Sequence, residues 1–232
     1  MTDEPRRRGR PPLVDRARIV AAARAIPAET LTMQVVADAL GVDRKTLNYH
    51  VSDRDGLLEL VAADVFAEVM ARLDVARAGT WQEAVRVYAD GVRAAVLQMG
   101  PLAPHFHLQH ASLGATLRPV DDLIQVLLDS GFPVRTVARC LRSISSQATA
   151  SGRDALREAT GTGSRDPGVS ASRAQVAVLR QAADDFPALR RLAAIDEPGI
   201  DPGQWGFEVD VCIAGLAQQL DAVVPVVGDD NA

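Results

Sequence analysis

The polar side chains of residues 43–50, DRKTLNYH, place many hydrogen-bonding groups in one short stretch. Guanidinium, ammonium, hydroxyl, amide and imidazole groups are the ones with which proteins bind phosphate oxygens and the edges of bases. Such groups act together only if a regular element holds them on one surface. The sequence on either side predicts that element.

Residues 31–51, LTMQVVADALGVDRKTLNYHV, predict two short helices separated by Gly41. Thr32 and Asp43 are suited to cap the two helices. The apolar positions that would pack them together are Val35, Val36, Leu40 and Leu47. This pattern is typical of a helix-turn-helix, whose second helix enters the DNA major groove with its N-terminal residues at the base edges. An ordinary αα-hairpin with a solvated polar face is the alternative.

A basic segment, RRRGRPPL (6–13), precedes the predicted helix-turn-helix. Its Arg-Gly-Arg-Pro core is suited to a narrow A·T-rich minor groove, where the negative potential is concentrated. The alternative is a disordered basic arm, which would still attract phosphate. Under either interpretation, this end of the chain is expected to approach a polyanion.

The charge of the whole chain is segregated along the sequence. The 232 residues carry a formal net charge of −5, which by itself argues against a nucleic-acid partner. Residues 6–24, however, contain seven arginines and one acid, whereas residues 196–232 contain eight acids and no Lys or Arg. One end of the chain is therefore predicted to meet a polyanion and the other is not.

Helical spacing of apolar residues predicts an all-α protein, and aromatic residues make up only 4% of it. We expect helices over residues 12–25 and 53–73, and others starting at Pro119, Pro133 and Asp201. Ser52 with Asp55 and Thr80 with Glu83 form candidate capping boxes, the second opening a helix that ends at Gly100. Two shorter helices are expected after Ser172 and over residues 187–195. We place a domain junction near residue 78.

Several classes of protein are disfavoured. Cys140 and Cys212 are the two cysteines and no CxxC motif occurs, which favours reduced thiols in a cytoplasmic protein. No apolar run approaches the ~18 residues of a membrane span. No GxSxG, HExxH or glycine-rich nucleotide motif is present in the context that its chemistry needs, so we expect neither an enzyme nor a cofactor.

Residues 9–66 resemble the N-terminal domain of the tetracycline-repressor (TetR) family of transcriptional regulators. In order, they hold a GRP arm, I-V-x-A-A, L-T-M-x-x-V-A-x-x-L-G-V and T-L-x-x-H-V-x-x-R-x-x-L-L. The resemblance implies a three-helix DNA-binding unit, a connecting helix, and a larger helical domain that binds a small molecule and dimerises. We therefore expect an arm over 1–12, a DNA-binding domain over 13–78, and a ligand-binding and dimerisation domain over 79–228.

The resemblance also implies roles for individual residues at the DNA. Base-edge contacts fall to Gln34, Arg44 and Thr46. Phosphate or backbone contacts fall to Thr32, Lys45, Tyr49, His50 and Arg54. We add Arg8 and Arg10 of the arm and Asn48, which stands where the family usually has tyrosine. Because one residue turns a helical side chain by ~100°, Tyr49 does not replace that tyrosine, and the operator sequence cannot be transferred from relatives.

The second domain resembles the family more loosely. Residues 113–132 are similar to a segment of the tetracycline-binding members, but Ser112 stands in place of their magnesium-binding histidine, so we do not expect tetracycline–magnesium. The HFHLQH stretch (105–110) could hold a metal, yet it lacks nearby Cys or acidic ligands, which favours a polar pocket lining or partly exposed histidines near the domain junction. The expected ligand-binding residues are Met99, His105, Phe106, His107, His110, Leu127, Ile144 and Gln147.

The last predicted helix carries a wide apolar stripe, which we expect to be the seam of a homodimer. Its members are Trp205, Val209, Ile213, Leu216 and Leu220. Taken together, the sequence predicts a regulator that binds a double-stranded DNA operator, most simply a repressor released by a small apolar or aromatic effector. The alternative is a helical small-molecule-binding protein or enzyme whose helix-turn-helix is vestigial.

Overall fold

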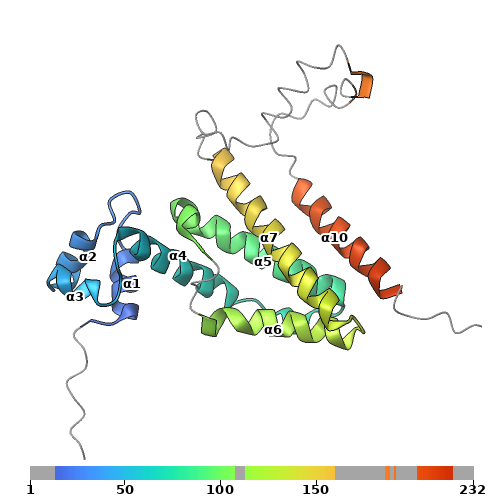
Figure 1. Ribbon diagram of the computed structural model, residues 1–232, viewed down its shortest axis with the longest axis horizontal. Coiled ribbons are helices and arrows are strands. Elements are labelled where there is room, and N and C mark those ends of the chain that lie inside the picture. The colour runs from blue at the N-terminus through green and yellow to red at the C-terminus, as the bar shows by residue number, and fades with distance from the viewer. Residues whose placement is uncertain (1–13, 108–112, 160–185, 189–190, 192–202, 222–232) are drawn as a thin grey trace, which may run out of the picture.

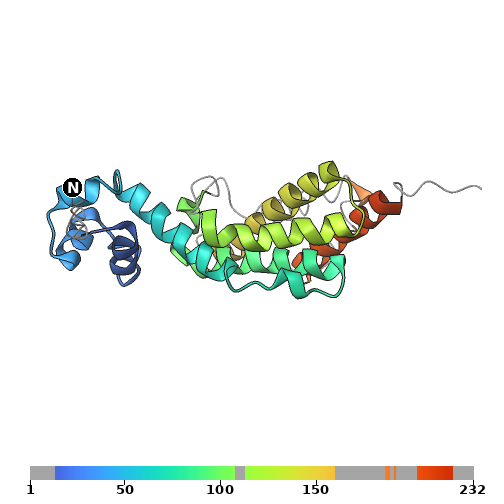
Figure 2. The same cartoon turned by 90° about the horizontal axis from the view of Figure 1, so that it is seen from below.

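The computed structural model describes residues 14–107, 113–159, 186–188, 191 and 203–221, and every regular element in these ranges is a helix. The all-α prediction is confirmed. A small unit of α1, α2 and α3 lies at one end, and α4 runs from it into a larger helical bundle (Figure 1). Seen from below, the molecule is elongated, with the small unit and α10 at opposite ends (Figure 2).

The small unit consists of α1 (Arg16–Arg24), α2 (Met33–Leu40) and α3 (Arg44–Asn48). Thr32 caps α2 by accepting a hydrogen bond from the Val35 N–H at 3.2 Å, and Asp43 caps α3 through the Lys45 N–H at 2.7 Å. Gly41 ends α2 in the left-handed region, with φ 66°, where glycine carries no Cβ penalty. The predicted caps and turn of the helix-turn-helix are confirmed.

The connecting helix α4 spans Arg54–Met70 and is followed by a 3-10 turn, η1 (Val75–Arg77). Its N-cap is Asp53, whose carboxylate accepts from the Gly56 N–H at 2.8 Å. The predicted Ser52 and Asp55 capping box is therefore wrong by one residue. The helix also ends before Leu73, because Ala71 and the residues after it turn into η1.

The molecule has two hydrophobic cores, and α4 belongs to both. Residues of α4 up to Val61 are buried with the small unit, whereas those from Ala62 onward are buried with the bundle. The half-buried Leu102 packs against both cores. The change of core thus lies inside a continuous helix, ahead of the junction expected near residue 78.

The bundle contains α5 (Trp81–Met99), η2 (Gly100–His105), α6 (Leu113–Asp129), α7 (Val134–Ala159) and α10 (Gln204–Asp221). The Thr80 half of the capping box of α5 is confirmed, since the Glu83 N–H donates to the Thr80 hydroxyl at 3.2 Å, while the Glu83 carboxylate accepts from the Gly79 N–H at 2.8 Å, one residue before the expected Thr80 N–H. The expected start of α6 at Pro119 is wrong, because the helix begins at Leu113 and holds this proline inside it. The helix expected after Ser172 and nearly all of that over 187–195 lie outside the described residues.

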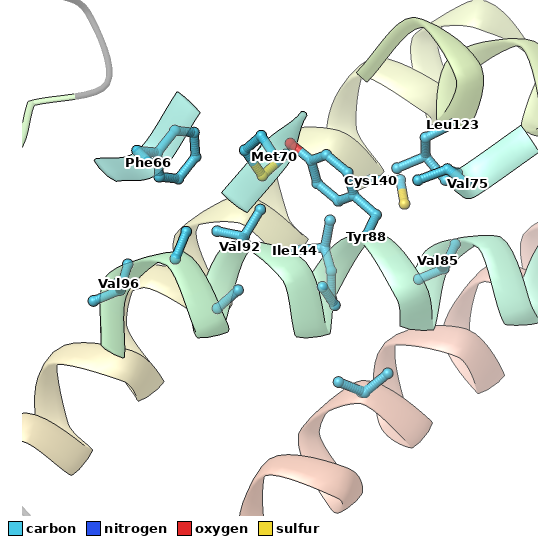
Figure 3. Packing of buried hydrophobic residues seen from close by; sticks show 14 of the residues in the cluster. Phe66, Met70, Val75, Val85, Tyr88, Val92, Val96, Leu123, Cys140 and Ile144 are labelled. Carbon is cyan, nitrogen blue, oxygen red and sulfur yellow. The ribbon is translucent and has the colours of Figure 1, made fainter. Parts of the chain in front are cut away.

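Close packing of α5 against α7 forms the centre of the bundle. Figure 3 shows Tyr88 and Val92 of α5 beside Ile144 of α7, with Met70 of α4 above them. A Cβ on Gly152 would lie 2.8 Å from the Val96 Cβ, so only glycine permits this approach. The two helices therefore pack closely, and α4 and η2 both contact this pair.

Candidate DNA interface and effector region

The candidate recognition surface is the outer face of α3. Leu47 is fully buried and anchors the helix, while Arg44, Lys45, Asn48 and Tyr49 are exposed, Tyr49 to 89%. Within the described part of the chain, no hydrogen bond or ion pair engages the side chains of Arg44 and Lys45. These cations are therefore available to a ligand outside the chain. Thr46 and His50 are half-buried at the edge of the same face.

The other expected DNA contacts fall into three groups. Gln34 is exposed on α2 and donates to Asp38 at 2.8 Å, and Thr32 is exposed while it caps the same helix. Arg54 instead binds its own chain, with Nε 2.9 Å from the Leu31 carbonyl oxygen and a terminal nitrogen 3.1 Å from that of Ala28. This arginine fastens the start of α4 to the residues before α2. Arg8 and Arg10 lie outside the described residues.

A second arginine ties the small unit to α4. Arg24, at the end of α1, contacts the Asp64 carboxylate at 2.9 Å and the Glu68 carboxylate at 2.6 Å. The hydrogen bond from Arg24 lowers the pKa of Glu68, which also contacts Arg72. Asp64 and Glu68 lie in the half of α4 that packs in the bundle. The two ion pairs therefore couple the orientation of α1 to that of α4.

The turn η2 and the two residues after it contact α4 on another side. We call residues 100–107 the η2 segment. The Phe106 ring stacks on Phe66 of α4 with centroids 4.6 Å apart. His105 Nδ1 lies 3.9 Å from Asp55, and His107 Nδ1 lies 3.6 Å from Glu59, one turn further along α4. These two histidines thus face α4, and His110 lies outside the described residues.

The remaining residues expected at the ligand separate into buried and exposed members. Met99, Phe106, Leu127 and Ile144 are buried together in the bundle core, whereas Gln147 is exposed on α7. Among the described residues, no group of three or more His, Cys, Asp or Glu side chains is placed to hold a metal ion.

Polar groups between α5 and α7 were missed by the sequence analysis. The Tyr88 hydroxyl lies 3.1 Å from that of Ser145, and burial raises the pKa of this tyrosine. More than one turn further along α5, Arg93 Nε donates to the Ser151 hydroxyl at 3.1 Å. No motif marks these residues, because each is paired with a partner more than 50 positions away.

The final helix presents two different faces. Val209 and Leu216 of the expected dimer seam are buried against the core of their own chain, and Trp205, Ile213 and Leu220 pack at its edge. Phe207 and Val211 are instead exposed, to 64% and 53%. Apolar side chains available to another molecule are thus on the opposite face from the predicted stripe.

Cys140 of α7 and Cys212 of α10 form a contact between these helices. Interaction with the Cys140 thiol lowers the pKa of Cys212 to about 7, while the same contact and burial raise the pKa of Cys140. Cys140 is buried and Cys212 is half-buried. Of the pair, Cys212 is therefore the reactive member.

The geometry has the parts of a helix-turn-helix regulator, and comparison with known proteins decides the family. Residues 76–220 match the family model described as "Tetracyclin repressor-like, C-terminal domain". The chain belongs to the TetR-like family. It therefore has the fold of a TetR-family transcription regulator. No match is found among curated proteins.

Solved structures of TetR-family proteins share this fold. A possible TetR-family transcriptional regulator of Streptomyces coelicolor A3(2) is 28% identical, with a TM-score of 0.67 over 88% of this chain and 99% of its own. The S. coelicolor protein ActR, in complex with actinorhodin, is 25% identical, with a TM-score of 0.65 over 89% and 98%. A TetR variant of Acinetobacter baumannii in complex with minocycline is 18% identical, with a TM-score of 0.57 over 88% and 97%. None of the helices in the described part of this chain is both long and apolar enough to cross a membrane.

Proposed function

We propose that this TetR-family protein binds a DNA operator through α3 and represses transcription until a small molecule releases it. The observation that carries this proposal is the exposed end of α3, where Arg44 and Lys45 extend from a helix fixed by the Asp43 cap and the buried Leu47. Positive side chains at the start of a recognition helix are placed for base edges and phosphates. Packing of the described residues gives no reason of its own for these two positive side chains at the start of α3.

A small-molecule effector is supported by the family. The structures of ActR and of the A. baumannii protein hold actinorhodin and minocycline, respectively. In this chain we place the effector next to Phe106, where buried apolar side chains meet the polar groups between α5 and α7. An apolar or aromatic compound with a few hydrogen-bonding groups suits such surroundings.

A homodimer is required to bind a two-fold operator tightly, because one short helix makes few base contacts. The Phe207 and Val211 face of α10 is our proposed interface, since it is where large apolar side chains of that helix are exposed. Two recognition helices would then contact half-sites ~34–36 Å apart.

The response would run through α4. This helix belongs to both cores and is held by Arg24 on one side and by the η2 segment on the other. A ligand that favours a different tilt of α4 changes the spacing of the two α3 helices. A tenfold loss of operator affinity needs ~1.4 kcal/mol of such coupling.

Selection of bound sequences from a random DNA pool tests the proposal. We expect the purified protein to enrich a near-palindrome, and Arg44→Ala to lose that enrichment. A protein that enriches no sequence would instead be a small-molecule-binding protein or enzyme with a vestigial helix-turn-helix. Recovery of bound fragments from the genome and transcript levels after deletion would then distinguish a repressor from an activator.

A further inference from the structure

Arg153 of α7 is a partly buried cation that has no anionic partner among the described residues. One of its terminal nitrogens lies 2.9 Å from the Phe106 carbonyl oxygen and 3.4 Å from that of Ala103. Its Nε is buried and makes no hydrogen bond, and no carboxylate among the described residues pairs with the side chain. The nearby Asp154 is paired with Arg157. Because a guanidinium is always charged and a buried unpaired donor is costly, this site lacks an acceptor.

The guanidinium edge that carries the unpaired Nε has the geometry for an acid. Nε and the terminal nitrogen that holds the two carbonyls form the side of the fork that binds a carboxylate through two parallel hydrogen bonds. Through the Phe106 carbonyl, Arg153 is joined to the residue whose ring stacks on Phe66 of α4. The surroundings therefore combine a cation with an aromatic stack.

We propose that Arg153 recognises the effector, and that this effector is an aromatic compound carrying a carboxylate or another ionised acidic group. The inference rests on the proposed function only in calling the bound compound an effector. Binding of the acid at Arg153 does not depend on DNA. Arg153 as a whole is half-buried, with its Nε on the buried side. An acid bound to the Nε edge also needs the adjacent terminal nitrogen. It therefore competes with the carbonyls of Ala103 and Phe106 for that nitrogen.

This competition connects the acid to the DNA-binding unit. The two carbonyls belong to the η2 segment, in which Leu102 packs against both cores and Phe106 stacks on α4. His105 and His107 of the same segment face Asp55 and Glu59. Loss of the Arg153 contact therefore loosens the segment that fixes α4.

Matched probes test the site directly. Naphthoate and anthracene carboxylate, each beside its neutral primary amide, are titrated into the full chain without DNA and followed by tryptophan fluorescence. We expect the acids to bind about tenfold or more tightly than the amides, and Arg153→Gln to abolish this preference. Arg153→Lys, which keeps the charge but lacks the two-donor edge, should lose at least about threefold in acid affinity. Arg142→Gln, an exposed arginine of the same helix, is the control and should change neither affinity.

Three results would overturn the proposal: equal affinity for acid and amide, no binding of either acid, or an acid preference that persists in Arg153→Gln. If the Gln variant does not melt cooperatively, the Lys variant decides by the same criterion. A second titration with enriched operator DNA separates this site from the proposed function. An acid preference in a protein that binds no DNA would contradict only the proposed function, and release of operator by the amides alone would contradict only the acid site.

Discussion

Arg44 and Lys45 are adjacent on α3, yet we expect different consequences from their loss. Arg44→Ala should cost ~1–3 kcal/mol of operator binding and relax the preference at one base pair, because a bidentate contact to a base edge carries specificity. Lys45→Ala should weaken binding evenly across sequences and lower its salt dependence. Fluorescence anisotropy on single-base operator variants measures both effects.

Arg77→Ala is the matched control for these variants, since this arginine is 85% exposed on η1. Its operator affinity should equal that of the parent. A Lys45→Ala protein that changes base preference as strongly as Arg44→Ala would contradict the assigned roles.

At Cys212 the lowered pKa predicts a pH-dependent reactivity. With a pKa of about 7, the thiol is protonated and slow to react below that pH, and its alkylation by iodoacetamide should reach a plateau above it. Cys140 is buried with a raised pKa and should remain unlabelled in the folded protein. Mass spectrometry of a pH series gives the rates, and Cys212→Ser should remove the labelling. A midpoint near the free-thiol value of about 8.5 would show that the contact with Cys140 does not act on the thiolate.

Among the helices, the α5 and α7 pair depends on one glycine. Gly152→Ala would place a Cβ 2.8 Å from the Val96 Cβ and 3.2 Å from the Arg93 carbonyl oxygen, so the helices must move apart. We expect a loss of ~1–3 kcal/mol in the free energy of unfolding, measured with denaturant. Gly206→Ala on α10, where nothing lies within 4 Å, is the control and should gain ~0.5–1 kcal/mol. Equal stabilities of the two variants would show that the helices adapt to the added methyl group.

Signals within a few residues predicted the elements well. Signals that depend on distant parts of the chain could not be inferred from the sequence. Thr32, Asp43 and Gly41 act within four residues of their own position, so their caps and turn could be inferred. Pro119 is favoured in the first turn of a helix and costly in its interior, so the local signal pointed to a start there, whereas α6 begins at Leu113 and tolerates the proline. In SDRD (52–55), two acceptors lie one residue apart, and the choice of Asp53 depends on the three-dimensional path.

The candidate site was predicted less completely, for the same physical reason. The exposure of α3 follows from its periodicity, because Leu47 alone is apolar in the middle of a polar stretch. Arg54 meets Leu31 and Ala28, and Arg153 meets Phe106, only because the fold brings distant segments together. Which arginine is exposed and which is structural is thus a property of packing, not of residue type.

On the scale of the whole molecule, the proposed dimer depends on the exposed face of α10. Phe207→Glu should produce monomers in sedimentation equilibrium and weaken operator binding strongly, because a charge in an apolar interface is costly. Gln98→Glu, which adds the same charge at an exposed position of α5, should remain dimeric. Leu216→Glu should instead destabilise the fold, since this leucine is buried in its own chain. A dimeric Phe207→Glu protein would place the interface on another surface.

The division of α4 between two cores has a consequence for synthesis on the ribosome. Apart from Leu102, the core of the small unit is complete at Val61, so that unit can form while the bundle is still being translated. At that moment the second half of α4 presents Phe66 and Met70 with no partners, because α5 and α6 have not yet emerged. Nascent or truncated chains that end near residue 80 are therefore expected to carry a folded DNA-binding unit and an apolar helix that recruits chaperones or aggregates.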